Sequence, residues 1–148
     1  MTGNPVTPVK EYRKPLPTMT RWSAPFWEGC KRGELLVQKC QDCQMLNFYP
    51  KLYCAECLSS NMEWVKVSGR GKVYSYMTVY AFQPTEFAED LPYVVAIVEL
   101  DEGVRMMSNI VSCHPDEVHC DMKVEVVFEK VTEEFTLAKF RPAERPEA

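Results

Sequence analysis

Two close pairs of cysteines are the residues whose types and spacing most directly predict chemistry. Two residues separate the members of each pair and ten separate the pairs, which consist of Cys40, Cys43, Cys54 and Cys57. A two-residue spacer lets both sulfurs of a pair reach one ion from a tight turn, and four thiolates suit tetrahedral zinc. Because thiolates fill all four positions, none remains for water or substrate, so the predicted zinc site is structural.

Other chemistry for the cysteines is less well supported. Four thiolates also hold iron in rubredoxin-type sites, but no other redox signature accompanies them here, which favours zinc. Cys30, Cys113 and Cys120 are predicted to be buried, small apolar residues. Neither His114 nor His119 belongs to a recognisable Cys–His–Asp arrangement, so the sequence does not support a cysteine nucleophile.

The composition narrows the class of protein. The 148 residues are 46% apolar and 26% charged, as in soluble globular proteins. Residues 1–67 carry nine basic and six acidic side chains, net +3, whereas residues 68–148 carry eight and fifteen, net −7. A nucleic-acid binder normally has a basic face, so DNA and RNA are disfavoured as partners. No membrane-length apolar run or secretory signal is present, so a cytoplasmic location is expected.

The elements that must position the cysteines begin with an N-terminal arm and a helix. Residues 1–22 contain four prolines and predict an extended arm. Ser23 is predicted to cap a helix that starts at Ala24, with Pro25 in its first turn and Gly33 at its end. A helix this short needs a packing surface. Its own chain and a partner remain alternative surfaces.

The remaining elements are predicted to be strands. Residues 23–61 are interpreted as the helix plus a zinc ribbon, and residues 143–148 as a flexible tail. Residues 62–142 are predicted to form a five-stranded OB-fold barrel, with a β-sandwich as the alternative. Its predicted strands are 71–82, 93–100, 104–111, 123–130 and 135–140. Gly103 is placed at a turn position that requires positive φ.

Motifs in a specific order carry a family resemblance. They are Phe26–Trp27, Gly33–Leu36, Cys40–Cys43, Phe48–Lys51, Cys54–Cys57, Glu63–Val65, Ser68–Ser75, Leu91–Ala96, Val98–Gly103 and Phe140–Ala143. On these residues the chain resembles the zinc-ribbon and OB-fold proteins associated with acyl-CoA enzymes. Departures from the family pattern are Gln44 in place of Gly, Lys51 in place of Arg, and Cys120-Asp121 in place of the Gly before Met122.

The resemblance implies a mainly β protein with a rubredoxin-like zinc ribbon before the barrel, acting as an accessory subunit. Such proteins partner thiolase-fold catalytic subunits in hetero-oligomers that act on CoA esters. One branch serves the benzoylsuccinyl-CoA thiolase of anaerobic toluene degradation. Subunits of CoA-ester hydratases or of hydroxymethylglutaryl-CoA synthase assemblies are alternatives, and so is a nucleic-acid-binding ribbon and barrel. A thiolase needs a cysteine nucleophile and an acid–base group, so the chemistry is expected in the partner.

Coenzyme A or an acyl-CoA is the ligand that the resemblance implies. Arg70 and Lys72 alternate with glycines, where backbone and cations can approach a phosphate, and Lys39 and Lys51 lie on the ribbon. The alternative interpretation is solvated charges beside glycines that bend a strand. Lys123 has no evident reason to meet the ligand. Some aromatic residues could stack adenine or line a pocket, or belong to core or interface: Phe48, Tyr49, Tyr74, Tyr76, Tyr80 and Phe82.

Overall fold

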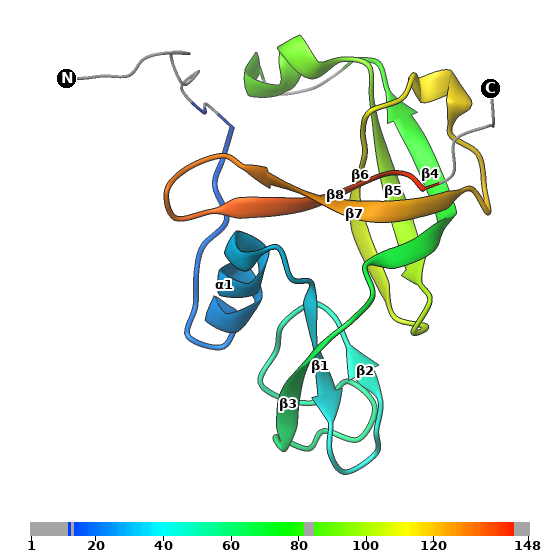
Figure 1. Ribbon diagram of the computed structural model, residues 1–148. Helices are drawn as coiled ribbons and strands as arrows, with labels where there is room; N and C mark the ends of the chain where they lie inside the picture. The colour runs from blue at the N-terminus through cyan, green and yellow to red at the C-terminus, as the bar shows by residue number, and fades with distance from the viewer. Residues whose placement is uncertain (1–11, 13, 82–84, 144–148) are drawn as a thin grey trace.

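The computed structural model describes residues 12, 14–81 and 85–143, which form a small three-stranded sheet, a closed five-stranded barrel and one α-helix (Figure 1). The ribbon sheet has the order β2-β1-β3, and the barrel has the order β4-β5-β6-β8-β7. The elements are α1 (Ala24–Arg32), β1 (Leu36–Cys40), β2 (Leu46–Asn47), β3 (Met62–Lys66), β4 (Arg70–Val79), η1 (Thr85–Asp90), β5 (Tyr93–Leu100), β6 (Arg105–Ile110), η2 (Pro115–Glu117), β7 (Lys123–Lys130) and β8 (Thr136–Pro142). The predicted fold class, a ribbon followed by a five-stranded OB-type barrel, is confirmed, and the β-sandwich alternative is not.

Helix α1 begins and ends where the sequence predicts, and Ser23 occupies its N-cap position. Pro25 lies in the first turn, and Gly33 ends the helix in the left-handed region, with φ of 80°. The prediction that Ser23 caps the helix through its side chain is wrong. The Ser23 hydroxyl accepts a hydrogen bond from the Thr20 backbone N–H instead, at 3.0 Å, so it is turned toward the arm and away from the helix.

Helix α1 packs against its own chain. Phe26 and Cys30 are buried, and the Phe26 ring lies 5.3 Å from the ring of Phe48 in the ribbon. On the barrel side, the Trp27 ring meets Phe135 edge-on at 5.2 Å. The helix is therefore a wedge that contacts both the ribbon and the barrel, and Figure 1 shows it between the β7–β8 hairpin and the ribbon strands.

Strand β3 belongs to the ribbon sheet by its hydrogen bonding. It pairs with β1 along its whole length, from Lys66 opposite Leu36 to Met62 opposite Cys40. The sequence prediction assigned residues 62–66 to the barrel domain, and the pairing differs because β1 takes a partner on each edge. The predicted arm and tail lie partly outside the described residues, so those boundaries stay predictions.

The barrel core is built by alternation along its strands. Val94, Ala96, Val98 and Leu100 on β5 point inward and are buried, while the alternate residues are half-exposed. Strands β6 and β8 close the barrel through one parallel residue pair, Ile110 with the fully buried Phe140. The closure is therefore narrow on this side of the barrel.

The turns and the remaining cysteines test further predictions. Gly103 has φ of 99°, as predicted, and Asp121 has φ of 70°, which explains the family's preference for glycine there. Cys30 is buried as predicted, Cys113 is half-buried, and Cys120 is exposed, so the prediction of burial is wrong for Cys120. In the described part of the chain, no helix is long and apolar enough to cross a membrane.

The two glycines that flank Arg70 have structural roles. A Cβ on Gly71 would lie 2.3 Å from the carbonyl oxygen of Glu99 and 2.9 Å from the Cα of Leu100. Gly69 has φ of 78°, and a Cβ there would lie 2.5 Å from a methyl group of Val126. Close approach of β4 to β5 therefore requires Gly71, and the left-handed backbone before β4 favours glycine at position 69, whatever the neighbouring cations bind.

Replacing Gly71 with alanine should lower the free energy of unfolding by about 2–3 kcal/mol, because the new methyl group collides with backbone that cannot move aside. Gly33→Ala is the matched control, since Gly33 has positive φ but a methyl group added there would have no atom within 4 Å. Only backbone strain acts there, about 1 kcal/mol. Urea unfolding of both variants measures the difference, and equal losses would refute the close-approach explanation.

Candidate metal centre and neighbouring sites

The four paired cysteines converge at the end of the ribbon. Their sulfur atoms all lie within 4.8 Å of one another. The Cys40 and Cys57 sulfurs are 3.5 Å apart, and those of Cys43 and Cys54 are 3.6 Å apart. Zinc–sulfur bonds of about 2.3 Å in a tetrahedron place sulfurs about 3.8 Å apart. The donor set therefore fits one tetrahedral zinc ion with no position left for substrate.

Each cysteine pair sits in the same kind of turn. The Gln44 N–H donates to the Cys40 carbonyl at 2.8 Å, and the Leu58 N–H donates to the Cys54 carbonyl at 2.9 Å. Gln44 and Leu58 have φ of 69° and 66°, in the region that favours glycine. The conformation explains why glycine is common at position 44 in the family, and Gln44 adopts it while its side-chain amide donates to the Gln41 carbonyl.

Backbone N–H groups of the turns stabilise thiolates, the form of cysteine that binds metal. The Cys43 N–H lowers the pKa of Cys40. The Cys57 N–H, helped by the Asn47 amide, lowers the pKa of Cys54 to about 6. The Met45 N–H lowers the pKa of Cys43, but desolvation and the three neighbouring sulfurs together outweigh it and raise the pKa to about 12. Negative charge on one sulfur opposes charge on the next, and a bound cation removes that opposition.

Asn47 supports the metal centre, and the sequence analysis did not single it out. Its side chain is buried, its amide nitrogen lies 3.5 Å from the Cys54 sulfur, and its amide oxygen accepts the Ala55 N–H at 3.0 Å. Partners of this kind orient metal ligands. The sequence signal that could have identified Asn47 is a polar residue at an inward-facing position of β2, the short strand that follows the first cysteine pair.

The four predicted CoA-binding cations fall in two places. On the ribbon, Lys39 lies on β1, and the main chain of Lys51 is held by the buried Gln38 side chain, at 2.9 Å and 2.8 Å. On the barrel, Arg70 and Lys72 point to the same exposed face of β4. Lys72 lies near two carboxylates, and its nitrogen is 3.9 Å from Glu99. Binding of CoA by these four cations stays a prediction.

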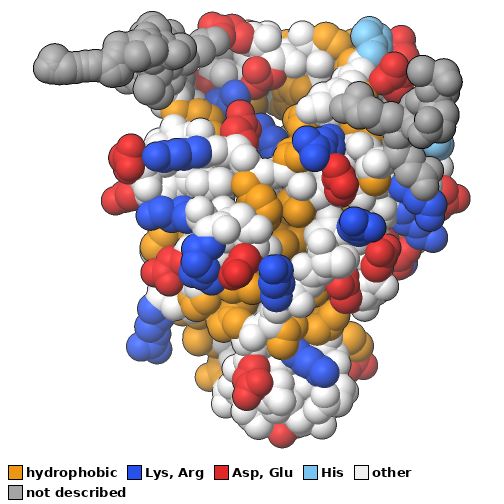
Figure 2. Space-filling model, in the orientation of Figure 1, with side chains coloured by type: hydrophobic (Ala, Val, Ile, Leu, Met, Phe, Trp, Pro, Cys, Tyr) orange, Lys and Arg blue, Asp and Glu red, His pale blue; other side chains and the backbone are white. Residues whose placement is uncertain are grey.

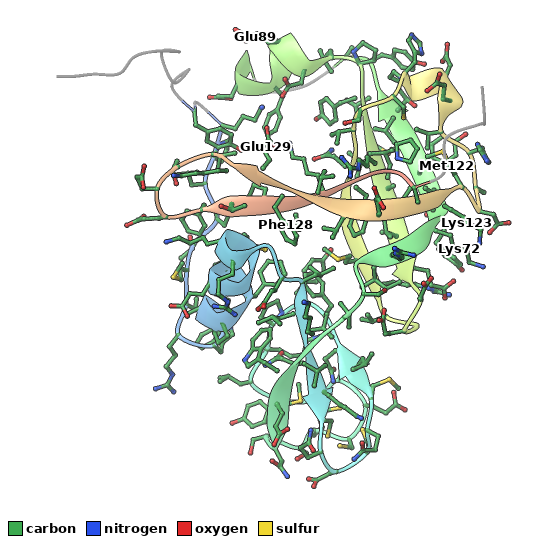
Figure 3. The ribbon with its side chains drawn as sticks, viewed as in Figure 1. Lys72, Glu89, Met122, Lys123, Phe128 and Glu129 are labelled. Atoms are coloured by element: carbon green, nitrogen blue, oxygen red, sulfur yellow. The ribbon has the colours of Figure 1, made fainter. Side chains whose placement is uncertain are left out.

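Lys123 is not remote from the candidate site. It lies directly opposite Lys72 in the pairing of β4 with β7, and both residues line one depression of about 360 Å³ with Glu99 and Gly71. Figure 3 shows the labelled Lys72 and Lys123 at the same edge of the barrel. The prediction that Lys123 has no reason to meet a ligand at Lys72 is therefore wrong.

The predicted aromatic candidates divide between surface and cavity. Phe48 and Tyr49 line a cavity between the ribbon and the barrel. Tyr74 is exposed, and the Arg105 guanidinium stacks over its ring at 3.8 Å. Tyr76 and Tyr80 are also exposed. Phe82 lies outside the described residues. Figure 2 shows hydrophobic side chains exposed where the barrel meets the ribbon.

Comparison with known families also divides the chain into a ribbon and a barrel part, with the boundary inside β3. The profile of the ChsH2 rubredoxin-like zinc ribbon domain matches residues 27–63. The profile of the ChsH2 C-terminal OB-fold domain matches residues 64–129.

Several relatives and solved structures resemble this chain. A DUF35 domain-containing scaffold protein of Methanothermobacter thermautotrophicus is 43% identical over 70% of this chain and 78% of its own length. The benzoylsuccinyl-CoA thiolase subunit BbsA of Geobacter metallireducens is 32% identical over 79% of each chain. A probable enoyl-CoA hydratase alpha subunit of Thermomonospora curvata is 38% identical over 88% of this chain, which spans only 40% of that relative. One chain of a solved Ltp2-ChsH2(DUF35) aldolase is 36% identical to this chain, with a TM-score of 0.77. The match covers 87% of this chain and all of the aldolase chain.

The purified protein should contain about one zinc ion per chain and be colourless, since zinc has no visible absorption. Cys54→Ser should abolish stoichiometric zinc and unfold the ribbon, because metal binding supplies much of a small ribbon's folding energy. Asn47→Ala should keep the fold and weaken zinc binding about 10–100-fold. Elemental analysis and chelator competition measure these effects.

Cys120→Ser is the matched control for the cysteine change, because Cys120 is exposed and lies outside the sulfur cluster. It should leave zinc content and stability unchanged. A red, iron-loaded protein from cells grown with ample zinc would contradict the zinc assignment.

Proposed function

This chain belongs to the ChsH2 (DUF35) family of zinc-ribbon and OB-fold proteins, and we propose that it is the non-catalytic subunit of a hetero-oligomer whose thiolase-fold partner acts on a CoA ester. The resemblance seen in the sequence, to the acyl-CoA-associated family that includes the benzoylsuccinyl-CoA thiolase subunit, is confirmed. The observation that carries the proposal is that the same two modules occur in chains named as subunits of thiolase, hydratase and aldolase assemblies.

The described side chains support a role without catalysis by this chain alone. The four ribbon sulfurs form a closed donor set. Burial raises the pKa of Cys30 to about 12, so this thiol is not a ready nucleophile. His114 is engaged locally, because its Nδ1 accepts the backbone N–H of Asp116. A thiolase reaction requires a nucleophile and an acid–base group together, and the partner would supply both.

A thiolase partner is favoured over a hydratase because the match covers more of the thiolase subunit than of the hydratase subunit. The match covers 79% of the Geobacter thiolase subunit but only 40% of the Thermomonospora hydratase subunit. The hydratase subunit thus has most of its length outside the match. Within the thiolase class, benzoylsuccinyl-CoA of anaerobic toluene degradation is the proposed substrate of the complex.

Contact with the CoA phosphates is proposed for Arg70 and Lys72, with Lys39 and Lys51 extending the basic surface on the ribbon. Support comes from the shared exposed face of Arg70 and Lys72 on β4. The nearby carboxylates oppose the proposal, since Lys72 lies within 3.9 Å of Glu99 and 3.8 Å of Asp121. A phosphate would have to compete with these exposed ion pairs, which are individually weak.

The isolated chain should show no thiolase, hydratase or hydrolase turnover on any CoA ester, because the catalytic groups lie in the partner. Co-expression with a thiolase-fold protein encoded beside it should give a stable complex, and turnover should appear only in that complex. Size-exclusion chromatography and a coupled CoA-release assay measure the two expectations. Turnover by the isolated, contaminant-free chain would disprove the accessory role.

Changing Arg70 and Lys72 together to alanine should raise the dissociation constant of CoA for the assembled complex about tenfold, since one charge-assisted hydrogen bond contributes about 1.5–3 kcal/mol. The effect should shrink at high salt. Lys130→Ala is the control, because Lys130 is also an exposed lysine beside a carboxylate, Glu133, at the other end of β7. Calorimetric titration at two salt concentrations tests this, and equal affinity at low salt would place the CoA site elsewhere.

A further inference from the structure

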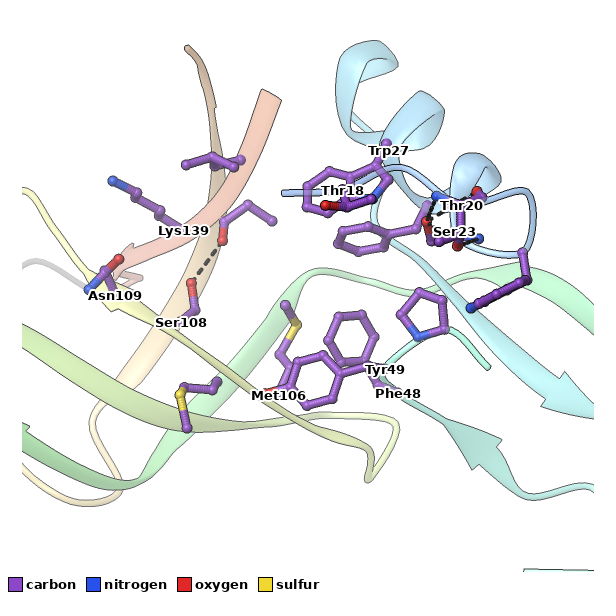
Figure 4. Close-up of a pocket in the computed structure, with 16 residues that line it drawn as sticks. Thr18, Thr20, Ser23, Trp27, Phe48, Tyr49, Met106, Ser108, Asn109 and Lys139 are labelled. Carbon is purple, nitrogen blue, oxygen red and sulfur yellow. Dashed lines mark hydrogen bonds between the residues drawn. The ribbon is translucent and has the colours of Figure 1, made fainter. Parts of the chain in front are cut away.

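A cavity of about 460 Å³ lies where helix α1 and the ribbon face strands β6 and β8 of the barrel (Figure 4). It is distinct from both the sulfur cluster and the cations of β4. One wall is aromatic and the opposite wall is aliphatic and sulfur-containing. The side chains that dominate the two walls are Phe26, Trp27, Phe48 and Tyr49 on one side, and Met106, Met107, Leu137 and Ala138 on the other.

The topology explains why a cavity forms at this place. Strands β6 and β8 pair at Ile110 and Phe140, and the residues that line the cavity precede this pair on both strands. There the link across the seam is a side-chain bond, in which the Ser108 hydroxyl donates to the Ala138 carbonyl at 2.8 Å. Helix α1 and the loop after β2 cover the seam from outside without filling it.

The aromatic wall is held rigid by ring contacts. The Phe26 ring lies 4.9 Å from the Trp27 ring and 5.3 Å from the Phe48 ring, both edge-on. Tyr49 packs against Phe48 at 4.6 Å. Fixed aromatic surfaces bind a ligand at little cost in side-chain entropy.

Large apolar side chains at the rim remain in contact with water. Tyr49 and Met107, which both line the cavity, are each 52% exposed. Covering them with an apolar group removes this surface from water, which is favourable. The volume is within the range of sites for small organic ligands, about 300–1,000 Å³.

The amide and the charged group of the lining are already paired. The Asn109 amide donates to the Val94 carbonyl at 2.9 Å, and Lys139 forms a 2.6 Å ion pair with Glu129. Lys139 is the one charged residue among those that line this cavity. The cavity therefore suits uncharged apolar surface and does not suit phosphates, which require unpaired cations or N–H groups.

A second cavity, of about 470 Å³, adjoins the first and is more polar. Asn109, Leu137 and Lys139 line both. The second cavity also contains the Lys14–Asp90 ion pair. A ligand with an apolar end and a polar, amide-containing arm would fit the two cavities, with the apolar end in the first and the arm in the second.

We propose that the apolar cavity binds the acyl group of a CoA thioester, a bulky acyl group that contains a ring, with its polar arm directed past Asn109 and Lys139. The inference rests on the proposed function for the choice of thioester, while the apolar character of the site rests on the lining itself. It places acyl recognition on this subunit, separate from the phosphate contacts proposed on β4.

The test is calorimetric titration of the full-length chain with benzoyl-CoA and, separately, with CoA. Benzoyl-CoA should bind about tenfold more tightly than CoA. Met107→Glu should remove this preference, because a carboxylate is placed against the acyl group. Met77→Glu is the matched control, since Met77 is an exposed barrel methionine, 60% accessible, that does not line the cavity. Both positions are exposed, so both variants should fold, which circular dichroism checks.

Tryptophan fluorescence gives a second readout. Trp22 and Trp27 line the cavity, whereas Trp64 does not. Benzoyl-CoA should quench the wild type and the Met77→Glu variant, and the Trp64→Phe variant should retain the quenching. Equal binding of benzoyl-CoA and CoA by the wild type, or an unchanged preference in Met107→Glu, would overturn the proposal.

Assembly with the thiolase-fold partner separates the two proposals. If the complex forms and turns over but the chain shows no preference for benzoyl-CoA, the acyl-site proposal fails and the accessory function stands. If the chain prefers benzoyl-CoA but never forms an active complex, the accessory function fails and the acyl site stands. If the wild type lacks the preference and Met107→Glu blocks assembly, the cavity is a contact surface for the partner and the acyl-site proposal is wrong.

Discussion

Convergence of four cysteine sulfurs on one point is the constraint on which the ribbon depends. The ribbon has few buried side chains of its own, and two of them, Cys40 and Cys54, belong to the cluster. A segment with so small a core is held by its metal rather than by hydrophobic burial. The buried Asn47 extends the same constraint outward, since one amide group contacts a sulfur and the following turn.

The loop after β2 connects the metal centre to the rest of the molecule, because it leads from β2 to Cys54. Gln38 on β1 holds the main chain of Lys51, so the loop that carries Phe48 is fixed to the ribbon sheet. Phe48 contacts Phe26 on the helix, and the next residue, Trp27, reaches the barrel. A structural ion and the apolar cavity are therefore connected by a short series of packed residues. We therefore expect loss of the structural metal to disturb one wall of the cavity as well as the ribbon.

Charge and apolar surface are separated on the barrel. The cations on the outer face of β4 and β6 stand beside carboxylates, as with Lys72 and Arg105 around Glu99. Weak, exposed pairs of this kind can exchange partners at little cost. The cavity beside β6 and β8 offers apolar surface and paired polar groups instead. In the proposed binding of a CoA thioester, the phosphate end and the acyl end contact different parts of the chain.

The sequence by itself determined the features that depend on a few neighbouring residues. The cysteine spacing predicted the sulfur cluster, Gly33 and Gly103 marked a helix end and a turn, and alternation predicted the barrel strands, because each is set by local geometry. Only the tertiary structure decided the ribbon position of β3, the exposure of Cys120, and the cavity between the helix and the β6–β8 seam. These depend on which distant segments meet, and residue patterns within a single segment do not encode that pairing.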